Sequence, residues 1–256
     1  MLSPFDYQRV ATASDAVALL RGNPEAKLLA GGQSLLASMR LGLSAPTQLL
    51  DLQSIPEFRE IKLQGAELSI GAMATHAMVA ASPLVQQFSP MLAKLAHGIA
   101  DEQIRQRGTI GGAIANNDPA ACWPCGLMAL KAVVVTSKRE ISCEDFFQGM
   151  FTTALEPDEI VCAVRFAKPK AAVYLKFDQP ASRFAIVGVA AAKFEDFAIR
   201  VAITGLGSGV VRFLDAEEIQ IKASDAMSDL HASAQYRVHL AMVLTKRAIA
   251  EITASG

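Results

Sequence analysis

The sequence reads KLLAGGQSLL from Lys27 to Leu36 and RGTIGGAIAN from Arg107 to Asn116. In each stretch a Gly-Gly pair accompanies apolar residues and has a hydroxyl or amide side chain beside it. Backbone without Cβ atoms can bring successive N–H groups against a phosphate oxygen, and glycine tolerates the positive φ that such a turn often needs. Together, the two stretches predict a pair of turns that grip a diphosphate from both sides.

Either stretch alone has a simpler interpretation, because Gly-Gly after an apolar run is usually a strand-to-helix turn. Neither contains the G-x-G-x-x-G pattern of Rossmann domains, and the chain has no G-x-x-x-x-G-K-[ST] phosphate loop. Gly205–Gly209 comes nearest to such a loop, but it lacks the third glycine, and we interpret it as a hairpin connection after an edge strand. The prediction of a diphosphate site therefore depends on both stretches being present.

Ten short motifs accompany these turns along the chain. They are Pro4–Tyr7, Ala30–Leu36, Leu49–Leu52, Ile70–His76, Asp101–Gly112, Asp118–Ala121, Asp145–Phe147, Tyr174–Phe177, Phe184–Ala190 and Ser233–Arg237. In this order they resemble the FAD-binding medium subunits of molybdenum hydroxylases, typified by aerobic carbon monoxide dehydrogenase and the flavin domain of xanthine dehydrogenase. The resemblance covers nearly the whole chain, and the number and order of the motifs make it specific.

The resemblance implies an α+β fold with two domains. Residues 1–170 would form an FAD-binding domain of the vanillyl-alcohol-oxidase/PCMH type, built from two small α/β subdomains at about 1–56 and 57–170. Residues 171–256 would form a small C-terminal α+β domain of antiparallel strands and helices, of the carbon monoxide dehydrogenase flavoprotein type.

The resemblance also implies which residues hold FAD. Diphosphate and ribose contacts would come from Leu29, Ala30, Gly31, Gly32, Gln33, Ser34 and Leu35, and from Thr109, Ile110, Gly111, Gly112 and Ala113. Val161 and Lys176 match positions near the flavin ring. We expect Lys176 to supply a positive charge that stabilises reduced, anionic flavin; the alternative interpretation is an exposed lysine on a strand.

Two places depart from the family's pattern. After Asp118–Ala121 the family commonly has an acidic residue that contacts the cofactor, but this chain has Cys122. We keep Cys122 as a candidate contact, although the resemblance does not decide whether it reaches FAD. Before the Phe-Ala-Ile stretch, where relatives usually have Arg and then Gly-Asp, the chain reads QPASR from Gln179 to Arg183. The altered charge leaves the electron acceptor unidentified.

Cys122 and Cys125 have the C-x-x-C spacing of redox pairs and metal sites. A redox pair usually lies at a helix N-terminus, and Asp118-Pro119 is typical of an N-cap followed by proline. A zinc or iron–sulfur site needs four ligands, however, and the sequence has no second C-x-x-C or nearby His pair. We interpret the two thiols as buried cysteines and expect no metal in this chain. His76 is expected to be a turn residue.

The composition describes a folded protein without the charge of a nucleic-acid binder. Of 256 residues, 52% are hydrophobic and 19% are charged, and the formal net charge is −1. No apolar run approaches the roughly 18 residues of a membrane span. Asp6 and Arg9 interrupt the place where a signal peptide would be apolar. The four cysteines fit the reduced thiols of a cytosolic protein better than a disulfide framework. We expect a cytoplasmic location.

Local patterns predict the elements of each part. In the first part we expect a helix capped by Ser14, strands at 27–30 and 49–52, and a helix at 34–40. A hairpin at 61–73, helices starting at Pro83 and Pro90, a helix from Asp118 to about Leu130, and strands at 133–135 and 159–166 follow. The last part is predicted to hold strands at 173–177, 186–194 and 198–204 and two closing helices, the last at about 235–252.

The resemblance implies a function in electron transfer. A large partner subunit would hold molybdopterin, a small one would hold two [2Fe–2S] clusters, and the subunits would form an αβγ heterotrimer or its dimer. FAD in this chain would collect electrons from the clusters and pass them to NAD, oxygen or a quinone. No catalytic side chain is expected here, because no Ser-His-Asp or Cys-His arrangement has a recognisable context.

Two other functions remain compatible with the sequence. One is a self-contained FAD-dependent oxidoreductase of the same flavin-binding fold, although only about 86 residues follow position 170 and they contain no catalytic motif. The other is an assembly module that has lost FAD, for which Cys122 is the only sign. The substrate of the whole enzyme is not encoded here, since the large subunit would select it.

Overall fold

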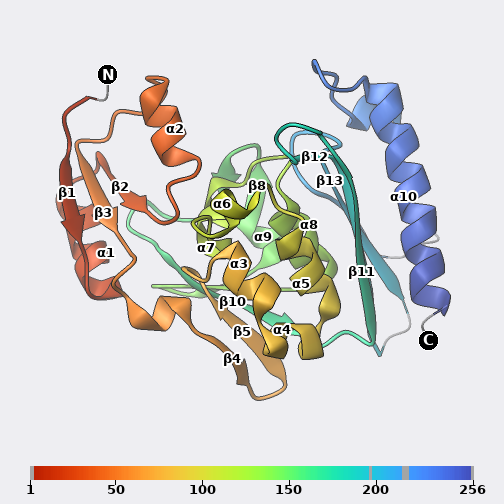
Figure 1. Cartoon of the computed structure of the whole chain (residues 1–256), viewed down its shortest axis with the longest axis horizontal. Helices are drawn as coiled ribbons and strands as arrows, with labels where there is room; N and C mark the ends of the chain where they lie inside the picture. Colours follow the sequence, from red (N-terminus) through yellow and green to blue (C-terminus); the bar gives the residue numbers. More distant parts are fainter. Residues whose placement is uncertain (1–2, 196–197, 215–218, 255–256) are drawn as a thin grey trace.

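The computed structural model describes residues 3–195, 198–214 and 219–254. Three sheets lie side by side along the molecule (Figure 1). The N-terminal strands are at the left in red and orange, the central sheet and most helices are in the middle, and the last sheet and the C-terminal helix are at the right. The fold is thus a mixed α and β arrangement.

The N-terminal sheet is parallel, with the order β1-β3-β2. It consists of β1 (Asp6–Arg9), β2 (Ala26–Leu29) and β3 (Gln48–Asp51), accompanied by α1 (Ala13–Gly22) and α2 (Leu35–Arg40). The cap of α1 is Thr12, whose hydroxyl accepts from Asp15 N–H, so the prediction of Ser14 as the cap is wrong by two residues. Both are hydroxyl residues before the same apolar stripe, but only Thr12 has a carboxyl residue, Asp15, three positions further on.

The central sheet is antiparallel, with the order β4-β5-β10-β6-β7. Its strands are β4 (Ile61–Gln64), β5 (Glu67–Gly71), β10 (Val161–Ala167), β6 (Val133–Thr136) and β7 (Glu140–Ser142). A short helix, η1 (Pro56–Arg59), precedes β4, and the two-stranded ribbon β8 (Phe147–Gly149) and β9 (Thr152–Thr153) lies apart. The predicted hairpin at 61–73 is confirmed, with its turn at Gly65.

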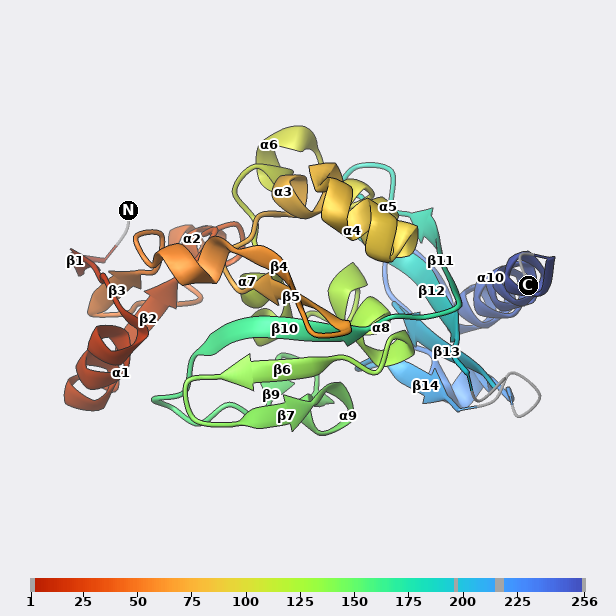
Figure 2. The same cartoon turned by 90° about the horizontal axis from the view of Figure 1, so that it is seen from below.

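Seven helices belong to this central part. They are α3 (His76–Ala81), α4 (Pro83–Phe88), α5 (Pro90–His97), α6 (Glu102–Arg105), α7 (Ile110–Asn116), α8 (Cys122–Ala129) and α9 (Cys143–Phe146). Figure 2 shows α3 to α6 on one side of the central sheet and α8 between that sheet and the last one. The main hydrophobic core lies around α8, which is buried along its whole length.

The start of α8 differs from the prediction. Asp118 does not begin the helix; its Oδ1 accepts from Ala120 N–H at 2.8 Å, and the helix starts only at Cys122. The carbonyl of Pro119 accepts instead from Thr204 Oγ1 and Gly205 N–H, at 2.8 and 2.9 Å. These bonds to a distant strand end hold 119–121 outside the helix.

The last sheet is antiparallel, with the order β11-β12-β13-β14. Its strands are β11 (Ala171–Asp178), β12 (Ala185–Lys193), β13 (Ile199–Thr204) and β14 (Val211–Phe213). One face packs on α8 and the other on α10 (Ala234–Ala254), so β12 is buried on both sides (Figure 1). The Gly205–Gly209 connection joins two antiparallel strands as predicted, but β13 is a central strand rather than an edge.

One buried arginine ties α10 to this sheet. Arg237 Nη1 donates to the carbonyls of Ile186 and Gly205, both at 2.6 Å, and Nη2 contacts Asp229 at 2.6 Å. The prediction of two closing helices is wrong for the described residues, where only a single turn, η3 (Ala223–Asp225), precedes α10 after β14. Within the same residues, no helix is both long and apolar enough to cross a membrane.

Candidate functional site

The two glycine stretches lie against each other. A Cβ atom on Gly31 would lie 2.2 Å from the carbonyl oxygen of Arg107 and 2.7 Å from Cα of Gly108. A Cβ atom on Gly112 would lie 3.3 Å from Cβ of Ala30. We call this contact between residues 30–32 and 107–112 the glycine seam. In the sequence 74 residues, 33–106, separate the two turns, and the fold brings their backbones into contact.

The first turn of the seam leaves its amides free. Gly32 has φ +73°, which favours glycine, and its carbonyl accepts from Leu36 N–H at 3.1 Å. Within the described chain, no acceptor receives the N–H groups of Gly31, Gly32, Gln33 or Ser34. Successive free N–H groups in such a turn form a concave anion site, so this segment fits a diphosphate.

The second turn contributes its shape rather than free amides. Ile110 N–H donates to Ala74 O, and Gly111 N–H donates to Ala72 O at 2.9 Å. The N–H groups of Gly112 and Ala113 donate to the Oγ1 and carbonyl oxygens of Thr109. The side chain of Ile110 is fully buried in the core. The two predicted turns meet, but their backbones are not equivalent.

Val161, predicted near the flavin ring, is buried at the start of β10. The next carbonyl, of Cys162, accepts from Ala72 N–H at 2.8 Å, and Ala72 is the residue that packs on Gly111. Val161 is therefore connected to the seam through Ala72, which directly follows β5. Leu29 and Leu35 flank the first turn and are half-buried.

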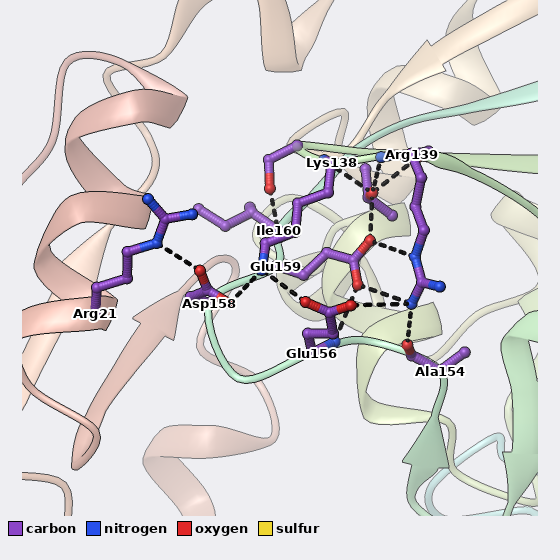
Figure 3. A network of polar contacts seen from close by, with 10 residues as sticks. Arg21, Lys138, Arg139, Ala154, Glu156, Asp158, Glu159 and Ile160 are labelled. Atoms are coloured by element: carbon purple, nitrogen blue, oxygen red, sulfur yellow. Dashed lines mark hydrogen bonds and ion pairs between the residues drawn. The ribbon is translucent and has the colours of Figure 1, made fainter.

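A polar network fixes the loop that leads into β10 (Figure 3). Asp158 pairs with Lys138 and, at 2.6 Å, with Arg21 of α1, and these contacts lower the pKa of Asp158 to about 2. Burial alone would raise the pKa of Glu159, but hydrogen bonds from Arg139, Thr136 and the backbone lower it instead. The network connects the N-terminal sheet's helix with the central sheet beside Val161.

Cys122, Tyr174 and Lys176 form a buried cluster. Lys176 Nζ donates to the carbonyls of Gly98 and Arg183, at 2.6 and 2.8 Å, and lies 3.2 Å from Asp178. Its side chain is only 6% exposed, so the alternative of an exposed strand lysine is wrong. Burial raises the pKa of the Cys122 thiol, and the charge of Lys176 and the hydroxyl of Tyr174 offset part of this rise.

His76 is a buried residue at the first position of α3 and not a turn residue, as the sequence had suggested. Its Nδ1 accepts from Trp123 Nε1–H at 3.1 Å, and its backbone N–H donates to Gly108 O at 2.9 Å. Trp123 is fully buried and directly follows Cys122. This pair therefore joins the seam to the Cys122 cluster, although neither residue was a predicted site residue.

Comparison with known proteins identifies a relationship over the whole chain. Residues 3–169 match the model of the family described as the FAD binding domain in molybdopterin dehydrogenase. The chain belongs to this family.

Relatives of this flavoprotein family align with the chain from end to end. The nicotine 6-hydroxylase medium subunit of Paenarthrobacter nicotinovorans is 33% identical over 273 residues, covering 96% of each chain. The carbon monoxide dehydrogenase medium chain of Hydrogenophaga pseudoflava is 33% identical over 279 residues, covering 97% of each. The solved structure of carbon monoxide dehydrogenase from Hydrogenophaga pseudoflava superimposes with a TM-score of 0.92 at 32% identity, covering 100% of this chain and 99% of that one. The chain is thus an oxidoreductase subunit with FAD as its cofactor.

The C-x-x-C motif of this flavoprotein is part of its core. Cys125 Sγ donates to Ala202 O at 3.0 Å, and burial raises the pKa of the Cys125 thiol strongly. A thiol with a raised pKa and no exposed surface is a poor nucleophile at neutral pH. The interpretation of Cys122 and Cys125 as buried cysteines is confirmed.

Acid is expected to weaken the folded flavoprotein through His76. Burial, with a smaller contribution from the charge of Arg105, lowers the pKa of His76 from 6.5 to about 4. Between these values the unfolded chain binds a proton that the native chain does not, so stability falls as the pH decreases from 6.5 to 4. The contribution reaches about 3 kcal/mol.

Urea unfolding of the full chain at several pH values in this window measures that effect. His76→Asn should flatten the dependence on pH, whereas the exposed His97→Asn should leave it unchanged. Equal slopes in the wild type and His76→Asn would show that His76 is not the group that titrates.

Proposed function

We propose that this chain is the FAD-carrying electron-transfer subunit of a multisubunit molybdenum hydroxylase. It would accept electrons from [2Fe–2S] clusters of a small partner subunit, which in turn receive them from a large molybdopterin subunit, and pass them to NAD, oxygen or a quinone. The observation that carries the proposal is the glycine seam, whose first turn combines a positive-φ glycine with four successive backbone N–H groups that have no acceptor among the described residues. The family membership and the medium-chain relatives support it.

In this proposal the residues of the seam hold the cofactor's diphosphate. The N–H groups of Gly31 to Ser34 would donate to phosphate oxygens. Gly112 would permit close approach from the other side, and Gly111, whose Cβ position faces Ala72, would let the second turn pack closely on the core. Bound FAD supplies one-electron acceptance and two-electron release, which suits a carrier between clusters and a two-electron acceptor. The chain's own task is to position that group, exclude water and set its potential.

The Cys122 cluster is the proposed surrounding of the flavin ring. Lys176 brings a buried positive charge there, only partly balanced by Asp178 at 3.2 Å. In this environment a neutral Cys122 thiol adds no negative charge, since burial raises its pKa. Lys176 would therefore stabilise an anionic group beside it more strongly than it would if position 122 held a carboxylate. Val161 would line the same region from β10.

We also propose the division into an FAD-binding domain at 1–170, of the vanillyl-alcohol-oxidase/PCMH type with subdomains at about 1–56 and 57–170, and a C-terminal domain at 171–256. The separation of the three larger sheets and the extent of the family match support these bounds. A heterotrimer or its dimer is the proposed assembly. A cytoplasmic location is supported by four unpaired cysteines, at 122, 125, 143 and 162.

Purification gives the direct test of this function. We expect the chain expressed alone to carry stoichiometric FAD without iron or molybdenum, and the chain coexpressed with its neighbouring genes to co-purify with an iron–sulfur and a molybdopterin subunit. In that complex a substrate of the large subunit should bleach the flavin absorbance. Iron or molybdenum without flavin in the isolated chain would refute the assignment.

The self-contained oxidoreductase makes the opposite prediction for the same sample. If the chain is recovered without partners and a small substrate reduces its flavin directly, that alternative is correct. An assembly module without FAD would show no flavin absorbance at all. One set of spectra thus separates the three functions.

A further inference from the structure

A histidine supports one side of the glycine seam from behind. His76 N–H donates to Gly108 O at 2.9 Å, and the imidazole lies beside the same residue. A Cβ atom on Gly108 would lie 2.8 Å from His76 Nε2 and 3.0 Å from Cδ2. On the seam side, Gly108 Cα meets the Cβ position of Gly31 at 2.7 Å. The imidazole, Gly108 and Gly31 therefore form three successive layers.

The orientation of the imidazole is fixed by Trp123. The indole N–H donates to Nδ1 at 3.1 Å, and both side chains are at least nine-tenths buried. Rotation of the ring would leave a buried N–H and a buried nitrogen without partners, which costs free energy. Because Nδ1 is the acceptor, the neutral ring carries its proton on Nε2, the atom beside Gly108.

We propose that His76 is a positioning residue of the cofactor site, which sets the place of Gly108 against Gly31 and thereby the spacing of the glycine seam. The inference rests on the proposed function, since FAD is the ligand that the seam would hold. His76 acts through Gly108 and does not itself touch the cofactor. Trp123 transmits the same constraint to Cys122, its neighbour in sequence.

The geometry at Gly108 offers a specific test. Gly108 does not have a positive φ, so its backbone accepts an L residue. Besides the imidazole, the nearest atom to an added methyl group is Ile104 O at 3.2 Å, which is tight but can be relieved by a small shift. Gly108→Ala should therefore push mainly on the His76 ring. His76→Asn keeps an acceptor for Trp123 Nε1–H and lacks the ring atoms that the methyl group would meet.

The experiment is a double-mutant cycle on FAD affinity. The full chain is stripped of flavin, and the dissociation constant for added FAD is measured for the wild type, Gly108→Ala, His76→Asn and the double variant. Each single variant should bind FAD about tenfold more weakly or worse, because each displaces Gly108. The double variant should recover to within about threefold of the wild type, since the methyl group fills the space that the ring vacates.

The stability of each variant is measured separately, so that a loss of folding is not mistaken for a loss of FAD affinity. Urea unfolding of each flavin-free variant reports its stability, and affinities are compared where the protein is fully folded. Single effects that simply add, or single variants with unchanged affinity, would overturn the role of His76. If the wild type itself takes up no FAD, the proposed function fails, which is a different result from wild-type binding with unaffected variants.

Discussion

Gly31→Ala should remove FAD from the folded chain. The new Cβ would lie 2.2 Å from Arg107 O and 2.8 Å from its carbonyl carbon, so backbone atoms on the opposite turn must move. A rotamer change cannot relieve such a contact, because the backbone fixes the position of Cβ and the atoms that it meets are backbone atoms. The two turns would separate, and we expect FAD affinity to fall more than about tenfold, a loss above roughly 1.4 kcal/mol. The measurement is flavin per folded chain after gel filtration, with a titration of added FAD.

Gly22→Ala is the matched control. It introduces the same methyl group at a glycine with no atom within 4 Å of the Cβ position, on α1 in the same part of the chain. Flavin content should remain at the wild-type level. If Gly31→Ala also retains full flavin, the seam does not hold the cofactor.

Gly32 and Gly111 are not equivalent probes of the same site. A Cβ on Gly32 would meet mainly the flexible side chain of Leu36 at 3.0 Å, although its φ of +73° strains any other residue. A Cβ on Gly111 would lie 2.6 Å from Cβ and 2.7 Å from O of Ala72, inside the core. Valine at Gly32 is therefore expected to release flavin from a folded chain, whereas valine at Gly111 should impair folding itself.

Arg237→Met should strongly destabilise the last part of the chain. Methionine fits the volume but leaves the carbonyls of Ile186 and Gly205 without the guanidinium donor, and Asp229 keeps only its hydrogen bonds from the backbone N–H groups of His231 and Ala232. We expect the free energy of unfolding to fall by about 3 kcal/mol. For a chain of this size the melting midpoint should decrease by roughly 10 °C.

Arg247→Met on the same helix is the control, since Arg247 is exposed. Its unfolding midpoint should stay close to the wild-type value. Thermal melts of both variants, followed by circular dichroism, make the comparison. Arg237→Met with a wild-type midpoint would show that the carbonyls find other donors and that this arginine does not fasten α10 to the sheet.

Local signals in the sequence predicted much of the fold. Ser82-Pro83 and Ser89-Pro90 each begin a helix as expected, because proline at the first position loses no hydrogen bond there. The predicted strands all exist in the described residues, with ends shifted by one or two positions. The start of α8 could not be predicted from Asp118-Pro119, since Thr204 and Gly205 decide it from 85 residues away.

In the candidate site too, the local sequence predicted the turns but not the contacts between residues far apart in the chain. Glycine pairs indicated turns, but nothing local indicated that Gly31 contacts Arg107. Nor did the local sequence indicate that N–H groups of the second turn donate to the carbonyls of Ala72 and Ala74. Lys176 was recognised by resemblance alone. Its buried amine donates to the carbonyls of Gly98 and Arg183, and the alternation of residues along the strand gives no sign of these contacts.

Trp123 is the chain's single tryptophan, and it is buried one residue from Cys122. Ultraviolet emission from tryptophan therefore originates from one known place in the protein. Oxidised flavin absorbs in the range where indole emits, so FAD at the Cys122 cluster would quench this emission by energy transfer. The unlabelled protein thus contains its own optical reporter of cofactor loading, which can be read continuously during flavin uptake, release or assembly with partners.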